Sequence, residues 1–179
     1  GTEIINYVRD LAKKLKLKPY DQKSHIGFLR YLVLRFGQNT NELMVNLVTA
    51  YEDLDLLIPL VAKLAKKFPQ ITSIVNNINT RKADVAFGEH EILLHGEPML
   101  KERLKDLTFQ ISSNSFFQTN SFMAEKLYDV ILDSAKLKGD EIALDLYCGT
   151  GSISLFLAQK VKFVYGFDII VSLLLTNLL

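Results

Sequence analysis

The chain contains 179 residues, of which 49% are hydrophobic and 23% are charged. This profile is typical of a globular protein with a buried core and excludes a largely disordered chain. The length allows one domain or two small ones. The single cysteine excludes an internal disulfide, a four-cysteine zinc site and a protein-held iron–sulfur cluster.

The formal net charge is only +1, so the overall charge does not indicate a nucleic-acid partner. Basic residues are nevertheless concentrated in one N-terminal stretch: Lys13, Lys14, Lys16, Lys18, Lys23, Arg30 and Arg35. Such a cluster is typical of a patch that attracts a polyanion, but also of a solvated helix face. The sequence leaves both interpretations open.

Neither end of the chain indicates membrane insertion. The N-terminal GTEIINYVRD lacks the apolar segment of a signal peptide. The apolar C-terminal IIVSLLLTNLL is shorter than the roughly 20 residues of a membrane span. We interpret it as a strand end and helix start, or as a tail that is not native sequence. We expect a cytoplasmic protein with no membrane partner.

The first half of the chain mixes helices and strands. Apolar spacing predicts a helix over residues 3–17, ended by Pro19, and a second over 52–68, which Pro59 would kink or shorten. Residues 26–36 and 42–50 have strand character and are joined by GQNTN, whose Gly and Asn suit a turn with positive φ. Further strands are predicted over 71–79, 91–96 and 107–112. This order favours an α+β domain.

The second half has a different character. SFMAEKLYDVILDSAKL, residues 121–137, predicts a helix with Ser121 as its N-cap. EIALDLYCGTG then gives a short apolar strand and a glycine-rich turn, followed by a helix over 152–161 and the strand KFVYGFD, residues 162–168. A strand, glycine loop, helix and strand in this order are typical of a nucleotide-binding βα unit.

Two glycines shape the predicted loop. Gly149 and Gly151 flank Thr150, where glycine lets backbone amides approach a ligand at a helix N-terminus. The third glycine of the dinucleotide fingerprint GxGxxG would fall at position 154, where Ser154 stands, and this disfavours an NAD or FAD site.

Carboxylates end both strands of this unit. Asp145 precedes the glycines, and Asp168 ends the following strand, where a carboxylate can accept both hydroxyls of a ribose. Acid, glycine loop, helix and second acid are the arrangement of S-adenosylmethionine-dependent methyltransferases. The pattern therefore favours S-adenosyl-L-methionine over NAD.

Four stretches carry a resemblance to one family: LRYLVLRFGQNTNELMVNLVT, GEHEILLHGEPMLKERLKDLTFQIS, SNSFFQTN with the following AEKLY, and LDLYCGTGSISLFLA. Together they resemble the RNA uracil-5-methyltransferase family, whose members modify tRNA or rRNA. The similarity runs from about residue 3 to residue 168. It implies an α+β central domain over residues 1–115. Residues 116–179 would then form the first β-α-β unit of a class I, Rossmann-like, S-adenosylmethionine methyltransferase domain.

The resemblance implies roles at matching positions. Gln118 would contact the methionine part of the cofactor, Tyr147 would line its pocket and Asp168 would hold the ribose hydroxyls. Ser152 stands where relatives often have Asn or Thr, and its hydroxyl would hydrogen-bond in their place. Each residue also has a structural alternative: Gln118 as a helix-capping amide, Tyr147 as core and Asp168 as a loop carboxylate.

The resemblance places the family's catalytic cysteine, its Asp-Pro-Pro segment and its general base downstream of this chain. We therefore expect no catalytic residue here, and an incomplete chain that is inactive alone. Cys148 is interpreted as a small residue packed beside the cofactor, although a thiolate is the nucleophile that uracil methylation needs at carbon 6. His25, His90 and His95 lack metal-ligand spacing, so no metal is expected. An exposed edge of the half-built sheet would promote oligomerisation.

The expected function is methylation of carbon 5 of a uridine in tRNA or rRNA by the parent protein, with RNA as its partner. One alternative is a class I methyltransferase with a different substrate. Another is a non-catalytic module that binds RNA or mediates assembly.

Overall fold

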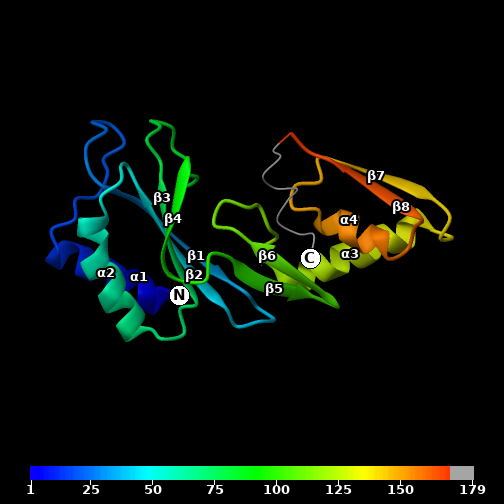
Figure 1. Cartoon of the computed structure of the whole chain (residues 1–179), viewed down its shortest axis with the longest axis horizontal. Helices are drawn as coiled ribbons and strands as arrows, with labels where there is room; N and C mark the ends of the chain where they lie inside the picture. The colour runs from blue at the N-terminus through cyan, green and yellow to red at the C-terminus, as the bar shows by residue number, and fades with distance from the viewer. Residues whose placement is uncertain (170–179) are drawn as a thin grey trace. The chain divides into compact units, whose positions relative to one another are not determined.

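A computed structural model describes residues 1–169 and divides the chain into two compact units (Figure 1). Unit 1 contains Gly1–Gly37, Asn41–Leu100 and Ser112–Asn114, and unit 2 contains Gln38–Thr40, Lys101–Ile111 and the residues from Ser115 onward. The domain boundary after residue 115 stays a prediction. Among the described residues, no helix has the length and hydropathy needed to cross a membrane. The predicted start of a helix within residues 170–179 lies outside the described residues.

Unit 1 contains a four-stranded sheet in the order β1-β2-β3-β4. The strands are β1 (Leu29–Phe36), β2 (Leu43–Thr49), β3 (Ser73–Ile78) and β4 (His90–Gly96). β1 pairs antiparallel with β2, β2 parallel with β3, and β3 antiparallel with β4. The predicted hairpin is confirmed, and Asn41 takes the positive φ of its turn at 59°.

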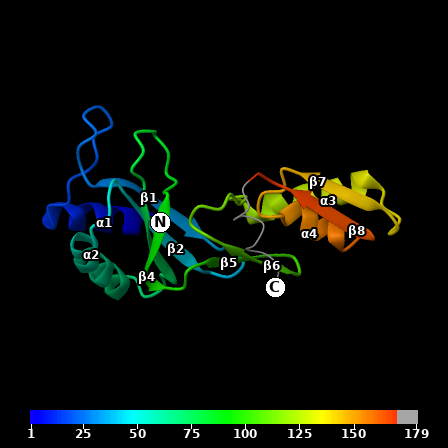
Figure 2. The ribbon, with the colours of Figure 1, turned by 45° about the horizontal axis from the view of Figure 1, so that its top comes forward.

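Helices α1 (Thr2–Lys14) and α2 (Leu54–Lys67) pack against each other and supply apolar side chains to the core of unit 1 (Figures 1 and 2). Ile4, Val8 and Leu11 of α1 join Leu57, Leu60 and Leu64 of α2 over Val45, Leu47 and Ile74 of the sheet. Asp53 caps α2 by accepting a hydrogen bond from the Leu56 amide at 3.2 Å. Pro59 lies inside α2 and does not shorten it, because tertiary burial of the apolar stripe outweighs one missing backbone hydrogen bond, while the alternative of a kink stays a prediction.

A buried polar network also belongs to unit 1. The Asn77 side chain donates to Asn46 Oδ1 at 3.2 Å, and Asn114 donates to Asn77 Oδ1 at 3.0 Å. The Arg35 guanidinium donates to the Ser113 carbonyl at 2.9 Å, and burial lowers the pKa of Arg35. These bonds fix residues 113 and 114, which open the SNSFFQTN segment.

Strands β5 (Leu100–Leu104) and β6 (Leu107–Ile111) form a two-stranded sheet, which belongs to unit 2 except for Leu100. β5 was not predicted, because its inward positions are Leu, Glu and Leu instead of a continuous apolar alternation. The buried Glu102 carboxylate accepts hydrogen bonds from the Gln38 amide at 2.7 Å, the Asn39 amide at 3.0 Å and the Ser121 hydroxyl at 2.6 Å. The hydrogen bonds explain how a carboxylate is tolerated in this interior.

Helix α3 (Ser121–Ala135) follows, and its predicted N-cap is wrong by one residue. Asn120 caps the helix by accepting from the Met123 amide at 3.0 Å, whereas Ser121 is buried and donates to Glu102. The chain then forms β7 (Ile142–Leu146), α4 (Ser152–Ala158) and β8 (Phe163–Phe167), with β7 and β8 parallel. The predicted order of strand, loop, helix and strand is confirmed.

Candidate cofactor site

The loop between β7 and α4 has an unusual backbone. Three of its residues have positive φ: Tyr147 at 63°, Gly149 at 55° and Gly151 at 72°. Tyr147 has a side chain and therefore adopts this conformation at an energetic cost, which is typical of functional loops. The Cys148 amide donates to the Phe167 carbonyl at 3.0 Å, and the Gly151 amide donates to the Cys148 carbonyl at 2.8 Å. The first bond attaches the loop to the end of β8, and the second closes a turn within the loop.

The loop requires glycine at positions 149 and 151 because of the backbone φ there, and not because a side chain would clash. A Cβ placed on Gly149 or Gly151 would meet no other heavy atom within 4 Å. The space beside both residues is therefore open, and the positive φ is the reason for glycine. A ligand can approach the backbone of the loop at these two positions.

The two predicted carboxylates, Asp145 and Asp168, accept hydrogen bonds from different parts of the β7–α4–β8 segment. Asp168 Oδ2 accepts a hydrogen bond from the Gly149 amide at 2.8 Å. Asp145 Oδ2 accepts from the Ser154 hydroxyl at 2.6 Å. Asp168 therefore holds the glycine loop directly, while Asp145 fastens the end of β7 to α4.

Close packing of α4 on the strands depends on a residue that the sequence reasoning missed. A Cβ on Gly166 of β8 would lie 3.0 Å from Cys148 Sγ and 3.3 Å from Ser154 Oγ. In the dinucleotide fingerprint the third glycine allows close helix–strand contact from the helix side. Here Ser154 occupies that position, and Gly166 provides the space from the strand side. The signal was a glycine within an otherwise apolar strand.

The remaining predicted site residues are less constrained. Tyr147 is 81% exposed, and this excludes the core alternative for its side chain in the described structure. The Tyr128 hydroxyl on α3 donates to Ser152 Oγ at 3.0 Å, a link that spacing along the sequence does not reveal. Gln118 lies exposed on the coil before α3. The Asn120 cap also answers the helix-capping alternative for Gln118, because another amide holds that position.

Cys148 lies beside both acids and is partly buried. Burial raises the pKa of the Cys148 thiol, and the negative charges of Asp145 and Asp168 raise it further. A thiolate, not a thiol, is the attacking species in nucleophilic catalysis. The surroundings of Cys148 therefore disfavour the nucleophilic form. Residues 1–169 contain no group of three or more His, Cys, Asp or Glu side chains that could hold a metal ion.

Comparisons with known proteins find similarity to RNA methyltransferases. Residues 89–174 match the family model described as tRNA (uracil-5-)-methyltransferase. An uncharacterized RNA methyltransferase of Halalkalibacterium halodurans is 42% identical over 168 residues, which cover 94% of this chain and 37% of that protein. The predicted resemblance to the RNA uracil-5-methyltransferase family is confirmed. A similar relative from Chlorobaculum tepidum is 43% identical over 170 residues, covering 94% of this chain and 35% of the relative.

A solved structure extends this agreement to the fold. The tRNA (uracil-54, C5)-methyltransferase of Pyrococcus abyssi, in complex with S-adenosyl-L-homocysteine, matches with a TM-score of 0.75 and 33% identity. The match covers 96% of this chain and 40% of that chain. The mixed α/β fold is therefore confirmed. The chain spans well under half the length of the relatives that it matches.

Proposed function

We propose that the parent protein transfers a methyl group from S-adenosyl-L-methionine to carbon 5 of a uridine in tRNA or rRNA. The observation that carries this proposal is the hydrogen bond from the Gly149 amide to Asp168, which closes a positive-φ loop at the end of two parallel strands. The family resemblance and the cofactor product bound to the Pyrococcus abyssi relative support the same assignment.

The residues of the loop fit the proposed cofactor. The open space beside Gly149 and Gly151 accommodates a ligand against the backbone. We infer that Asp168 accepts hydrogen bonds from the ribose hydroxyls, that exposed Tyr147 lines the pocket and that Gln118 contacts the methionine part. Ser152 and Asp145 position the loop through Tyr128 and Ser154. The cofactor supplies an electrophilic methyl group when bound.

The reaction on uracil also needs a nucleophile at carbon 6, because carbon 5 becomes nucleophilic only after that addition. We assign this role to no described residue. The raised pKa of Cys148 disfavours it as the attacking group. The contribution of residues 142–168 is instead to bind and orient the cofactor, with RNA as the proposed partner.

The test is a calorimetric titration of the chain with S-adenosylhomocysteine. We compare the unchanged chain with Asp168→Ala, Asp168→Asn and the matched control Asp133→Ala, which removes an exposed carboxylate of α3. Saturable binding that is lost in both Asp168 variants and kept in the control supports the ribose role. Binding that survives in Asp168→Asn reduces Asp168 to a loop anchor, because asparagine still accepts from the Gly149 amide.

One outcome favours a different function. A folded chain that binds RNA in a salt-sensitive manner but does not bind S-adenosylhomocysteine would contradict the cofactor assignment. It would instead support the non-catalytic RNA-binding module. A class I methyltransferase with another substrate predicts the reverse, cofactor binding without RNA binding.

A further inference from the structure

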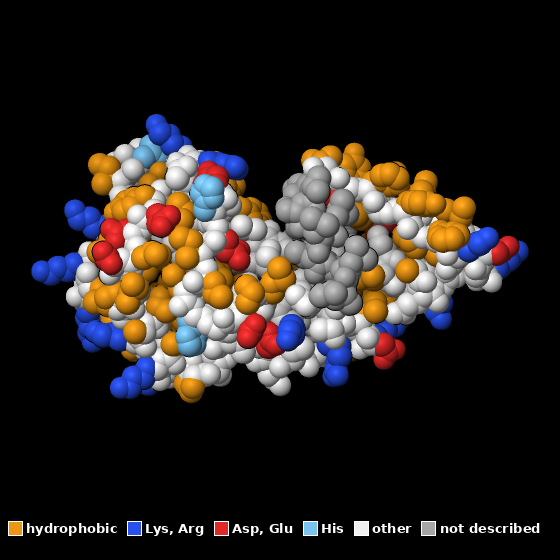
Figure 3. Space-filling model, viewed as in Figure 1, with side chains coloured by type: hydrophobic (Ala, Val, Ile, Leu, Met, Phe, Trp, Pro, Cys, Tyr) orange, Lys and Arg blue, Asp and Glu red, His pale blue; other side chains and the backbone are white. Residues whose placement is uncertain are grey.

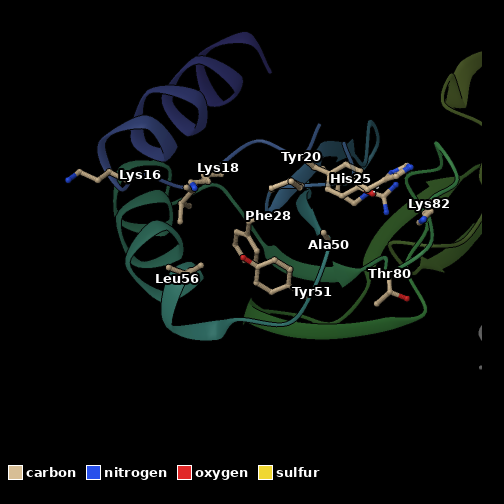
Figure 4. Close-up of a pocket in the computed structure, with 14 residues that line it drawn as sticks. Lys16, Lys18, Tyr20, His25, Phe28, Ala50, Tyr51, Leu56, Thr80 and Lys82 are labelled. Atoms are coloured by element: carbon tan, nitrogen blue, oxygen red, sulfur yellow. Dashed lines mark hydrogen bonds between the residues drawn. The ribbon is translucent and has the colours of Figure 1, made fainter. Parts of the chain in front are cut away.

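A pocket of about 680 Å³ lies in unit 1, within the part of the chain that carries the N-terminal basic residues (Figure 4). Its volume falls within the range of about 300–1,000 Å³ that is usual for small-ligand sites. Of its fourteen lining residues, three are lysines, one is arginine and none is Asp or Glu. The residues that define its character are Lys16, Lys18, Lys82, Arg30, Tyr20, His25, Phe28 and Tyr51.

The floor of the pocket is aromatic. The Phe28 and Tyr51 rings lie 5.0 Å apart between centroids. Phe28 is buried with 1% of its surface exposed, whereas Tyr51 is 48% exposed and therefore offers its ring to solvent. A buried ring behind an exposed ring is a rigid platform on which a planar base can stack. Figure 4 shows this pair between Lys16 and Lys18 on one side and Lys82 on the other.

The lysines can serve a polyanion. Lys16, Lys18 and Lys82 are all exposed and line the pocket on both sides of the aromatic floor (Figure 4). Two carboxylates lie in the neighbouring loops: Asp21 accepts from the Ser24 amide at 2.6 Å, and Asp84 accepts hydrogen bonds from Tyr31 and Gln22. These hydrogen bonds come from neutral donors and leave both carboxylates negatively charged. Neither residue lines the pocket, however, so the charged groups of its lining are the three ammonium groups and the Arg30 guanidinium.

Arg30 has a structural role, because its guanidinium holds together the residues that form one wall of the pocket. Its guanidinium donates to the Asn79 carbonyl at 2.8 Å and to the Ala83 carbonyl at 2.7 Å, and it lies 4.4 Å from the Tyr20 ring centroid. Gln22 donates to Asp84 at 3.0 Å and so joins the loop around residue 22 to the loop around residue 84. The wall is preformed and needs no ligand to assemble.

The loop that carries Tyr20 and His25 is also constrained. His25 has a φ of 58°, and Gly27 has a φ of 127° with Pro19 O only 2.1 Å from where its Cβ would lie. The Tyr20 hydroxyl lies 3.0 Å from His25 Nδ1. Glycine fits the backbone at position 27, so His25 is the strained residue of this loop, and strain of this kind is often found at functional sites.

We propose that this pocket of unit 1 binds an unpaired nucleotide of single-stranded RNA, with the base stacked on Tyr51 and the neighbouring phosphates held by Lys16, Lys18 and Lys82. The proposal rests on the proposed function, since it names the surface outside the cofactor loop that receives part of the RNA substrate. Under this proposal, Lys16, Lys18 and Arg30 of the basic stretch line the pocket. Arg30 and Arg35 also donate to backbone carbonyls, so their role is structural.

The experiment measures binding of the chain to a fluorescent single-stranded uridine-rich oligonucleotide over a range of salt concentrations. The triple variant Lys16→Gln, Lys18→Gln and Lys82→Gln should bind about 10- to 100-fold more weakly at 0.1 M salt and lower the salt slope by about 2. Tyr51→Leu keeps an apolar side chain over Phe28 but removes the stacking ring. It should weaken binding by about 5- to 150-fold and leave the salt slope unchanged.

The matched control is Lys63→Gln, Lys66→Gln and Lys67→Gln, which removes three exposed charges from α2 of the same unit. Equal losses in the two triple variants, or unchanged binding by Tyr51→Leu, would overturn the proposal. Uridine monophosphate that binds as tightly as the oligonucleotide would also overturn it, by assigning the pocket to a free nucleotide.

Titration with S-adenosylhomocysteine on the same preparations separates this proposal from the proposed function. Retained cofactor binding with no pocket-dependent RNA binding refutes the pocket alone. Absence of cofactor binding by the unchanged, folded chain refutes the cofactor role proposed for its glycine loop, whatever the pocket variants show.

Discussion

Two segments of the described chain, β2–α2–β3 and β7–α4–β8, each consist of a strand, a helix and a parallel strand. The burial of their strands differs sharply. In β2–α2–β3, all of β3 and nearly all of β2 are buried. In β7–α4–β8, no strand residue is fully buried, and Ile142, Leu144, Leu146, Phe163, Tyr165 and Phe167 are each more than half exposed. Parallel strands are usually covered on both faces. The comparison shows that the same order of strand, helix and strand can have buried strands in one segment and exposed strands in another.

Exposed apolar side chains gather over β7 and β8 (Figure 3). The register pairs Ile142 with Phe163, Leu144 with Tyr165 and Leu146 with Phe167 across the two strands. A contiguous apolar patch favours association with another surface. The expected oligomerisation stays a prediction, and light scattering over a concentration series measures it.

The largest expected effect comes from truncating a buried leucine in β2–α2–β3 and an exposed leucine in β7–α4–β8. Leu60→Ala removes a side chain with 0% exposure and should lower the free energy of unfolding of unit 1 by about 2–5 kcal/mol. Leu144→Ala removes the same atoms from a side chain that is 62% exposed and should cost less than about 1 kcal/mol. Amide hydrogen exchange of β2 and β7 under mild denaturant measures both. Equal losses would show that β7 is covered in solution.

A second substitution tests how tightly α4 packs on β7 and β8. Gly166→Ala places a Cβ 3.0 Å from Cys148 Sγ and should destabilise the β7–α4–β8 unit by about 1–3 kcal/mol through overpacking. Adding Cys148→Ala removes the contacted sulfur and should recover part of that loss. Thermal unfolding of the single and double variants gives the coupling. No recovery would mean that the strain lies against Ser154 instead.

Prediction from sequence succeeded where periodicity and turn chemistry agree, as in the hairpin of β1 and β2 and in the order of β7, α4 and β8. It failed at β5, because the buried Glu102 is stabilised by donors as distant as Gln38 and Ser121. In the candidate site, the glycines and acids were visible in the loop motif. Tyr128 and Gly166 were not, because their roles depend on contacts across elements.

A substitution with a smaller expected effect tests the observed N-cap of α3, a helix that contacts α4. Asn120→Ala removes the side-chain acceptor for the Met123 amide and should cost about 1 kcal/mol. Thr119→Ala, at the exposed preceding position, is the matched control and should stay within about 0.5 kcal/mol of the unchanged chain. Urea unfolding followed by circular dichroism compares the two. Similar losses in both would show that the cap does not stabilise the helix.

The smallest expected effect is on the reactivity of the Cys148 thiol, in the loop between β7 and α4. Because burial and the charges of Asp145 and Asp168 raise the pKa of Cys148, its thiolate is disfavoured, and iodoacetamide should react more slowly than with a free cysteine at pH 8. Asp145→Asn removes one negative charge and should therefore shift the pH profile of alkylation towards lower pH. Mass spectrometry of the alkylated chain gives the rates. A profile that lies below that of free cysteine would instead make Cys148 a nucleophile, and the carbon 6 attack would then have a candidate within this chain.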